Sequence, residues 1–216
     1  MLAELLPTDV IAVEIVGDDP TAYLLPDEQH LVARSVDKRR REVTNARTSA
    51  RRALARLGIA ETPIPRGAKG EPLWPAGVVG SITHTTDYYA AAVAHASKVR
   101  SIGVDAEVHG VLPEGVLRHI AFGPELDWLA AQPAGPVHWD RLLFSAKESV
   151  YKAWFPLTGR WLGFEEAEVT IDETGTFAVR ILIDGATHHG PPLTTMSGRW
   201  LVRDGLVLTA ITLPVA

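Results

Sequence analysis

Two acidic residues close an apolar segment of this sequence. In "SIGVDAE" (101–107) a short apolar run is followed by Asp105 and Glu107. Because alternate side chains of a strand point to the same side, both carboxylates can face one cation. Oxygen-only ligands favour a hard ion, Mg²⁺ or Mn²⁺, over zinc. The alternative interpretation is a strand that simply ends in a solvated acidic turn.

A second pair of charges lies about 40 residues further on. The stretch "FSAKESVYKAWF" (144–155) has the aromatic and aliphatic residues of a buried amphipathic helix, yet it carries Glu148 and Lys152 in its middle. Residues four apart project from one face of a helix, so these two side chains are neighbours. As a surface ion pair they would contribute only about 0.3–0.5 kcal/mol. Other features of the chain must decide between this interpretation and a functional site.

A third feature is basic. Residues 34–56 hold nine Arg or Lys residues and two acids, so this segment carries +7 and the rest of the chain −12. On a helical wheel, Arg39 and Arg47 fall in or beside the apolar stripe, with Arg40 and Arg51 on its flank. A guanidinium there needs an anionic partner. That partner is either an internal carboxylate or a bound phosphate.

Four further residues are candidates for the same site: two basic residues that suit a phosphate, and two polar residues at the end of an apolar segment. Arg66 and Lys69 lie in the Pro/Gly-rich loop "ETPIPRGAKGEPLWPAG", and Thr83 and His84 end the apolar segment "GSITHT". A lone histidine is more often structural. His84, however, lies between two elements rich in charge and precedes the acidic strand.

The elements that must position these residues can be assigned from periodicity and turn signals. We expect an α+β fold of two subdomains, 1–108 and 109–216, because Gly110 and Pro113 interrupt the pattern. The predicted strands are 9–16, 78–83, 88–95 and 100–107, with hairpins over 167–185 and 198–213; the predicted helices are 31–57, 113–122, 123–132 and 137–155, the last stopped by Pro156.

Composition excludes several classes. The chain has no cysteine, which rules out disulfides and cysteine-ligated zinc and suits a reducing compartment. The N-terminus lacks the basic region of a signal peptide, and no apolar run is long enough to span a bilayer. We therefore expect a cytoplasmic protein. There is no Walker A loop and no dinucleotide fingerprint, so a nucleotide would bind in another way.

Taken together, the Arg-rich helix, "GSITHT", "IGVDAE" and "FSAKESVYKAW" resemble the Sfp/EntD-type 4′-phosphopantetheinyl transferases. The likeness is greatest to the actinobacterial type that serves fatty-acid, polyketide and nonribosomal peptide synthases. It runs from about residue 30 to the C-terminus. Two departures, Phe144 where the family often has Trp and Ser149 where it often has Ala, lie outside the chemistry.

The resemblance implies a reaction and a set of roles. Such enzymes transfer phosphopantetheine from coenzyme A to a serine of an acyl or peptidyl carrier protein, with the active site in a cleft between two pseudo-twofold halves. It implies that Asp105, Glu107 and Glu148 hold Mg²⁺, with Mn²⁺ possible. Glu148 would take the serine proton, and Lys152 would neutralise a pyrophosphate oxygen. Arg39, Arg47, Arg66, Lys69, Thr83 and His84, with Asp105, Glu148 and Lys152, would line the coenzyme A site.

Two other classes stay open at this point. A metal-dependent nuclease or phosphodiesterase also uses acids at a strand end followed by a Glu/Lys pair, but usually has a broad basic surface. A non-catalytic module that binds coenzyme A or carrier proteins would not need three carboxylates. No nucleic-acid or membrane partner is expected, and the family implies a monomer.

Overall fold

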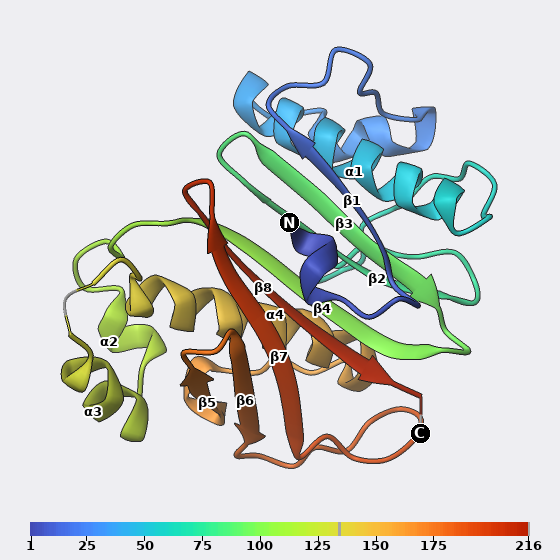
Figure 1. Cartoon of the computed structure of the whole chain (residues 1–216). Coiled ribbons are helices and arrows are strands. Elements are labelled where there is room, and N and C mark those ends of the chain that lie inside the picture. The colour runs from blue at the N-terminus through green and yellow to red at the C-terminus, as the bar shows by residue number, and fades with distance from the viewer. Residues whose placement is uncertain (134, 216) are drawn as a thin grey trace.

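The computed structural model describes residues 1–133 and 135–215, which form two antiparallel sheets, each covered by one long helix (Figure 1). The smaller sheet has the order β1-β3-β2 and the larger has the order β4-β8-β7-β6-β5. This mixed architecture confirms the expected α+β class. The strands are β1 (Ile11–Val16), β2 (Val78–Thr85), β3 (Tyr88–His95), β4 (Val99–Val108), β5 (Ala167–Asp172), β6 (Thr176–Ile181), β7 (Thr195–Arg203) and β8 (Leu206–Pro214).

The helices differ from the expected ones at their ends. They are α1 (Asp37–Arg56), α2 (Leu117–Ile120), α3 (Pro124–Ala131) and α4 (Trp139–Thr158), with 3-10 turns η1 (Leu2–Leu5), η2 (Pro26–Val32) and η3 (Phe164–Glu166). The predicted helix from residue 31 begins later, because Val36 is extended and caps α1. The predicted stop at Pro156 is wrong: α4 continues to Thr158 and ends at Gly159, whose left-handed backbone (φ 62°) closes the last turn.

Three apolar clusters hold these layers together. The first lies between α1 and the smaller sheet and includes Ala53, Leu54 and Val93. The second lies between the two sheets, and the third, which includes Trp154, lies between α4 and the larger sheet. Alternation along β3 explains how one strand serves two clusters: Ala90, Ala92 and Ala94 face one, Ala91 and Val93 the other.

The two sheets meet where β2 runs beside β4. Hydrogen bonds from backbone amides of β4 to side-chain hydroxyls of β2 join the two strands there. The Ser81 hydroxyl accepts a hydrogen bond from the Val104 amide at 3.1 Å, and the Thr83 hydroxyl accepts one from the Ala106 amide at 3.0 Å. These contacts fix the end of β2 against the acidic end of β4.

The predicted boundary between residues 108 and 109 stays a prediction. β4 precedes that boundary in the chain, yet it pairs along its length with β8 of the larger sheet. Within the described ranges, no helix is both long and apolar enough to cross a membrane.

Candidate active site

The site starts from the alternation of β4. Ile102, Val104 and Ala106 enter the core between the sheets, so the residues between them face α4. Gly103 allows the helix to come close: a β-carbon at this position would lie 1.9 Å from the Ser149 carbonyl oxygen. The close approach places the middle of α4 directly over the acidic end of β4.

Asp105 is the centre of the resulting polar cluster. Its Oδ1 accepts a hydrogen bond from the Lys152 ammonium at 2.7 Å and another from the Thr83 hydroxyl at 3.3 Å. Its Oδ2 accepts one from the Ser145 hydroxyl at 2.9 Å. Asp105 is only 5% exposed, so these donors replace its water. These contacts join the acidic end of β4 to the charged face of α4.

The Lys152 ammonium is held at two points. Besides Asp105 it donates to the Val104 carbonyl at 3.1 Å. Its side chain keeps 26% of its surface exposed, and it lines the cavity described below. Lys152 is thus anchored to β4 while still able to meet a ligand.

Glu148 and Glu107 flank Asp105 and feel its charge. Burial, and then the Asp105 carboxylate, raise the pKa of Glu148. The same two causes raise the pKa of Glu107, although Arg141 donates to it at 3.0 Å. The three carboxylates predicted as metal ligands therefore lie within electrostatic reach of one another. They are not assembled as a metal site, however: the described residues contain no group of three or more His, Cys, Asp or Glu side chains that could hold an ion.

The third charge in the middle of α4 points elsewhere. Lys147 is buried, and its ammonium donates to Glu125 of α3 at 2.7 Å and to the Phe164 carbonyl at 2.7 Å. This pair fastens α3 to α4. It explains why a buried helix carries Lys147 without giving it a role in the cluster around Asp105.

A cavity of about 780 Å³ opens between α1 and α4. Its walls come from α1, the loop that follows it, β2 and α4. Glu148, Tyr151 and Lys152 form the α4 side, while Trp74 and Ile82 supply apolar surface. The predicted residues Arg39, Arg47, Arg66, Lys69, His84, Glu148 and Lys152 all line it.

Arg47 is the strongest sign of an anionic ligand. The residue is 8% exposed, and its Nε has no hydrogen-bond partner in the described chain. Burial, together with Arg66, Arg51 and Arg39, lowers the pKa of Arg47 to about 10, against the opposing charge of Glu28. Arg47 is still cationic at neutral pH. A buried, protonated and unpaired guanidinium facing a cavity calls for an anion.

His84 contacts an arginine of the cavity and also feels the charges of Lys152 and Asp105. Its Nε2 lies 2.9 Å from Nη1 of Arg39, which also pairs with Glu42 at 3.1 Å. Burial, and then the Arg39 charge, lower the pKa of His84. The imidazole is thus neutral at neutral pH, with Nε2 accepting from Arg39.

Two of the predicted ligand-site residues, Thr83 and Asp105, do not line the cavity. Thr83 is 3% exposed, and its hydroxyl instead links Asp105 to the Ala106 amide. Sequence reasoning also missed Ser145 and Arg141, the partners of Asp105 and Glu107. Helical spacing was the one sequence feature that pointed to Ser145 and Arg141, because residues 141, 145, 148 and 152 share a face of α4.

Comparison with known proteins agrees with this geometry. Two family models match: the 4′-phosphopantetheinyl transferase N-terminal domain over residues 27–94 and the 4′-phosphopantetheinyl transferase superfamily over residues 101–196. The 4′-phosphopantetheinyl transferase PptT of Mycobacterium tuberculosis is 52% identical over 99% of this chain and 98% of its own. The 4′-phosphopantetheinyl transferase Npt of Nocardia iowensis is 49% identical, over 98% of this chain and 99% of its own.

A more distant relative shares the larger part of the chain. Enterobactin synthase component D of Salmonella typhimurium is 32% identical over 81% of this chain and 72% of its own. The two family models together span the Arg-rich helix, the acidic strand and α4, which supply the walls of the cavity. The chain belongs to the 4′-phosphopantetheinyl transferase superfamily.

Proposed function

We propose that this protein transfers the 4′-phosphopantetheine group of coenzyme A to a serine hydroxyl of apo acyl or peptidyl carrier proteins. The observation that carries the proposal is one cavity with two charged regions. Arg47, buried and unpaired, lies on one wall, and Glu148 and Lys152 lie on another. Coenzyme A carries a 3′-phosphate on its ribose and a pyrophosphate, so the ligand has a phosphate group for each of the two charged regions of the cavity.

The bond changes set the demands on the residues. The serine oxygen attacks the phosphorus that carries pantetheine, and the bond from that phosphorus to the bridging oxygen breaks. Adenosine 3′,5′-bisphosphate leaves with the electron pair. The serine loses a proton, and negative charge grows on the leaving phosphate. Transfers of this type need positioning, a base and cations rather than a covalent intermediate.

Glu148 fits the role of base. It lines the cavity, and its raised pKa makes it a better proton acceptor than an exposed glutamate. Lys152 fits the role of the cation beside the leaving phosphate, because Asp105 and the Val104 carbonyl hold its ammonium at the cavity wall. Thr83 and Ser145 orient Asp105 by their hydroxyls.

The carboxylates also fit a divalent ion. Their donor atoms are all oxygen, and a cation would relieve the burial and the Asp105 charge that raise the pKa values of Glu107 and Glu148. Mg²⁺, or Mn²⁺, held by these three residues would neutralise pyrophosphate charge. Lys152 and Arg141 are the present partners of Asp105 and Glu107, so they would share those carboxylates with the ion.

The 3′-phosphate is assigned to the arginine side. Arg47 supplies the unpaired guanidinium, while Arg39, Arg66, Lys69 and the neutral His84 surround it with donors. Discrimination then follows from the unsatisfied cation: a ligand without the 3′-phosphate leaves Arg47 buried without a partner.

Neither alternative accounts for the site as well. A nuclease is disfavoured by family membership and because residues 34–56 carry +7 while the rest of the chain carries −12. A binding module would not need Glu148 and Lys152 beside the ligand cavity. The monomeric state and the cytoplasmic location stay predictions.

Mass spectrometry of an apo carrier protein tests the proposal. The protein is incubated with the carrier, coenzyme A and Mg²⁺, and the carrier should gain the mass of one phosphopantetheine group. Addition of EDTA should stop the gain, and replacement of the carrier serine by alanine should abolish it. A carrier that keeps its mass in the complete mixture would contradict the proposal.

A further inference from the structure

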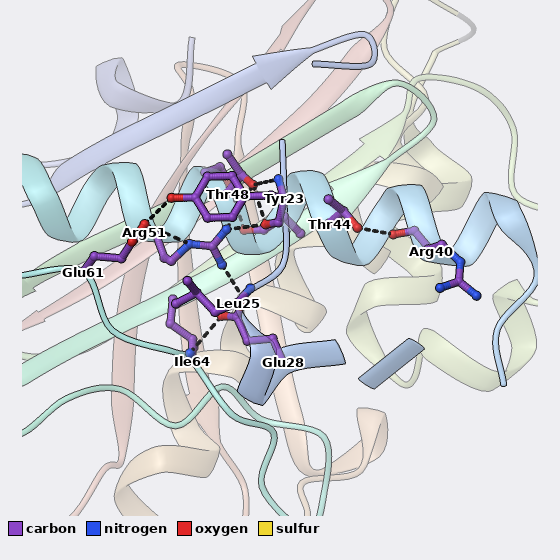
Figure 2. Close-up of polar contacts among 11 residues, drawn as sticks. Tyr23, Leu25, Glu28, Arg40, Thr44, Thr48, Arg51, Glu61 and Ile64 are labelled. Atoms are coloured by element: carbon purple, nitrogen blue, oxygen red, sulfur yellow. Dashed lines mark hydrogen bonds and ion pairs between the residues drawn. The ribbon is translucent and has the colours of Figure 1, made fainter. Parts of the chain in front are cut away.

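Glu28 is a fully buried carboxylate outside the polar cluster around Asp105. It lies in η2, and none of its surface is exposed. Its Oε2 accepts from the Leu25 amide at 3.0 Å and from Nη1 of Arg51, and its Oε1 accepts from the Ile64 amide at 2.9 Å. Figure 2 shows these donors converging on it from three separate segments of the chain. A buried carboxylate requires such a set of donors.

Arg51 of α1 is the cationic partner of Glu28. Its side chain is 4% exposed. Nη2 donates to the Tyr23 carbonyl, and the guanidinium lies 4.6 Å from the centroid of the Tyr23 ring (Figure 2). Arg51 thus ties the segment before α1 to the helix, and its Nε lies 3.9 Å from the Glu61 carboxylate in the segment after it. Arg51 does not line the cavity.

Arg47 lies one turn before Arg51 on the same face of α1. Arg51 therefore holds the Glu28 carboxylate one helical turn from Arg47, and the charge of Glu28 opposes the lowering of the Arg47 pKa. If Glu28 lacked Arg51, it would be a buried anion next to a buried, unpaired guanidinium. The two would pair, because each relieves the desolvation of the other. The cavity would then lose its free cation.

We infer that Arg51 is a positioning residue for ligand selection: by engaging Glu28, it keeps the guanidinium of Arg47 free for an anionic group in the cavity. The inference rests on the proposed function, which supplies the 3′-phosphate of coenzyme A as that group. The two arginines on this face of α1 then have different roles. One satisfies the internal carboxylate, and the other stays available to the ligand.

The test compares binding of coenzyme A and dephospho-coenzyme A by isothermal titration calorimetry. Wild type should bind coenzyme A more tightly. Arg51→Met should weaken coenzyme A binding about tenfold, the worth of one charge-assisted contact, and leave dephospho-coenzyme A binding nearly unchanged. The double variant Glu28→Gln/Arg51→Met removes the competing carboxylate and should restore the preference. Loss of binding followed by rescue is a coupling that packing alone does not produce.

Two further variants keep the test decisive. Arg51→Lys retains a cation for Glu28 and should keep the preference, even if the lost Tyr23 contact lowers its melting temperature. Arg52→Met, the matched control, removes the neighbouring exposed arginine, which pairs with Asp19 at 2.6 Å, and should also keep it. Wild-type preference in Arg51→Met, failure of the double variant to restore it, or equal loss in Arg51→Lys and Arg51→Met would each overturn the inference.

The same measurements separate the inference from the proposed function. Binding is measured without a carrier protein, so it does not depend on transfer. A protein that binds as described but never modifies a carrier would refute the transfer activity and support the role of Arg51. A wild type that binds both ligands equally would overturn the inference, even if transfer occurs.

Discussion

Gly103 of β4 lies directly under the carbonyl group of Ser149 in α4, so close that a β-carbon on Gly103 would come within 1.9 Å of that oxygen. The contact sets how near α4 sits to β4. On either side of it, Ser101 donates to the Ala153 carbonyl at 2.7 Å, and Asp105 receives the Ser145 hydroxyl. The glycine of "IGVDAE" is therefore the reason that Glu148 and Lys152 can reach the acidic strand.

Replacing Gly103 by alanine should separate the two elements. Overpacking of this kind costs about 1–3 kcal/mol, and the shift falls on the polar cluster around Asp105. We expect a lower melting temperature and a large loss of kcat in Gly103→Ala. Gly110 is the matched control, because a β-carbon there meets no atom within 4 Å. Gly110→Ala should behave like wild type; equal stability and activity in Gly103→Ala would show that the close approach is not needed.

Two buried serines of α4 should respond differently to the same change. Ser145 and Ser149 both lie 3.0 Å from the Thr209 hydroxyl, but only Ser145 also donates to Asp105. Ser145→Ala removes a donor that orients Asp105, so we expect kcat to fall about tenfold, the worth of a hydrogen bond to a charged group. Ser149→Ala should keep full turnover. Steady-state kinetics with melting temperatures would distinguish a positioning role from lost packing, which would affect both variants alike.

The ionised carboxylate of Glu148 should lower the stability of the folded protein. Its pKa in the folded protein is raised, so its ionised form is disfavoured by folding. The resulting cost is present above the folded pKa and disappears as pH falls through that value towards the unfolded one. Glu148→Gln removes this cost, and no hydrogen bond of the described chain is lost with it. The variant should therefore melt higher than wild type at pH 7–8, and the difference should shrink in acid.

A pH series of thermal melts on wild type and Glu148→Gln checks this. Glu42→Gln, in a partly exposed carboxylate that pairs with Arg39, is a suitable comparison because it removes a favourable contact instead. If Glu148→Gln is less stable than wild type at neutral pH, the ionised carboxylate is not under strain in the free protein.

Arg47 should determine selection for the 3′-phosphate. In Arg47→Ala we expect the KM for coenzyme A to rise at least tenfold, because a charge-assisted contact is lost, and the KM for dephospho-coenzyme A to change little. The measurement is the ratio of kcat/KM for the two substrates. An equal loss for both would mean that Arg47 supports the fold of the cavity and does not contact the phosphate.

The residues that meet across β4 and α4 could be predicted in part. Alternation placed Asp105 and Glu107 on one side of a strand, and helical spacing placed Glu148 and Lys152 on one face. The wheel likewise put Arg47 in the apolar stripe of α1. What periodicity could not give was the partner of each charge. Arg51 pairs with an internal carboxylate and Arg47 does not, although both lie near the stripe.

The unpredicted features depend on contacts between distant segments. Thr83 matched a ligand position by resemblance, but the meeting of β2 and β4 turns its hydroxyl towards Asp105. Arg141 reaches Glu107 only because α4 begins beside the end of β4. Pro156 does not end α4, because a proline in the last turn removes only one backbone hydrogen bond near the end of the helix. The helix ends at Gly159. Local propensity carries none of this information.

Single-turnover transfer from saturating coenzyme A to an apo carrier protein, followed by quenching and mass spectrometry, tests the central claim most directly. It compares wild type with Glu148→Gln and Lys152→Ala under conditions where binding no longer limits the rate. The account predicts that the rate of phosphopantetheine transfer falls by about a hundredfold or more in Glu148→Gln, which loses the base, and also falls in Lys152→Ala, which loses charge stabilisation of the leaving phosphate. Wild-type rates in either variant, with the protein folded, would contradict the account.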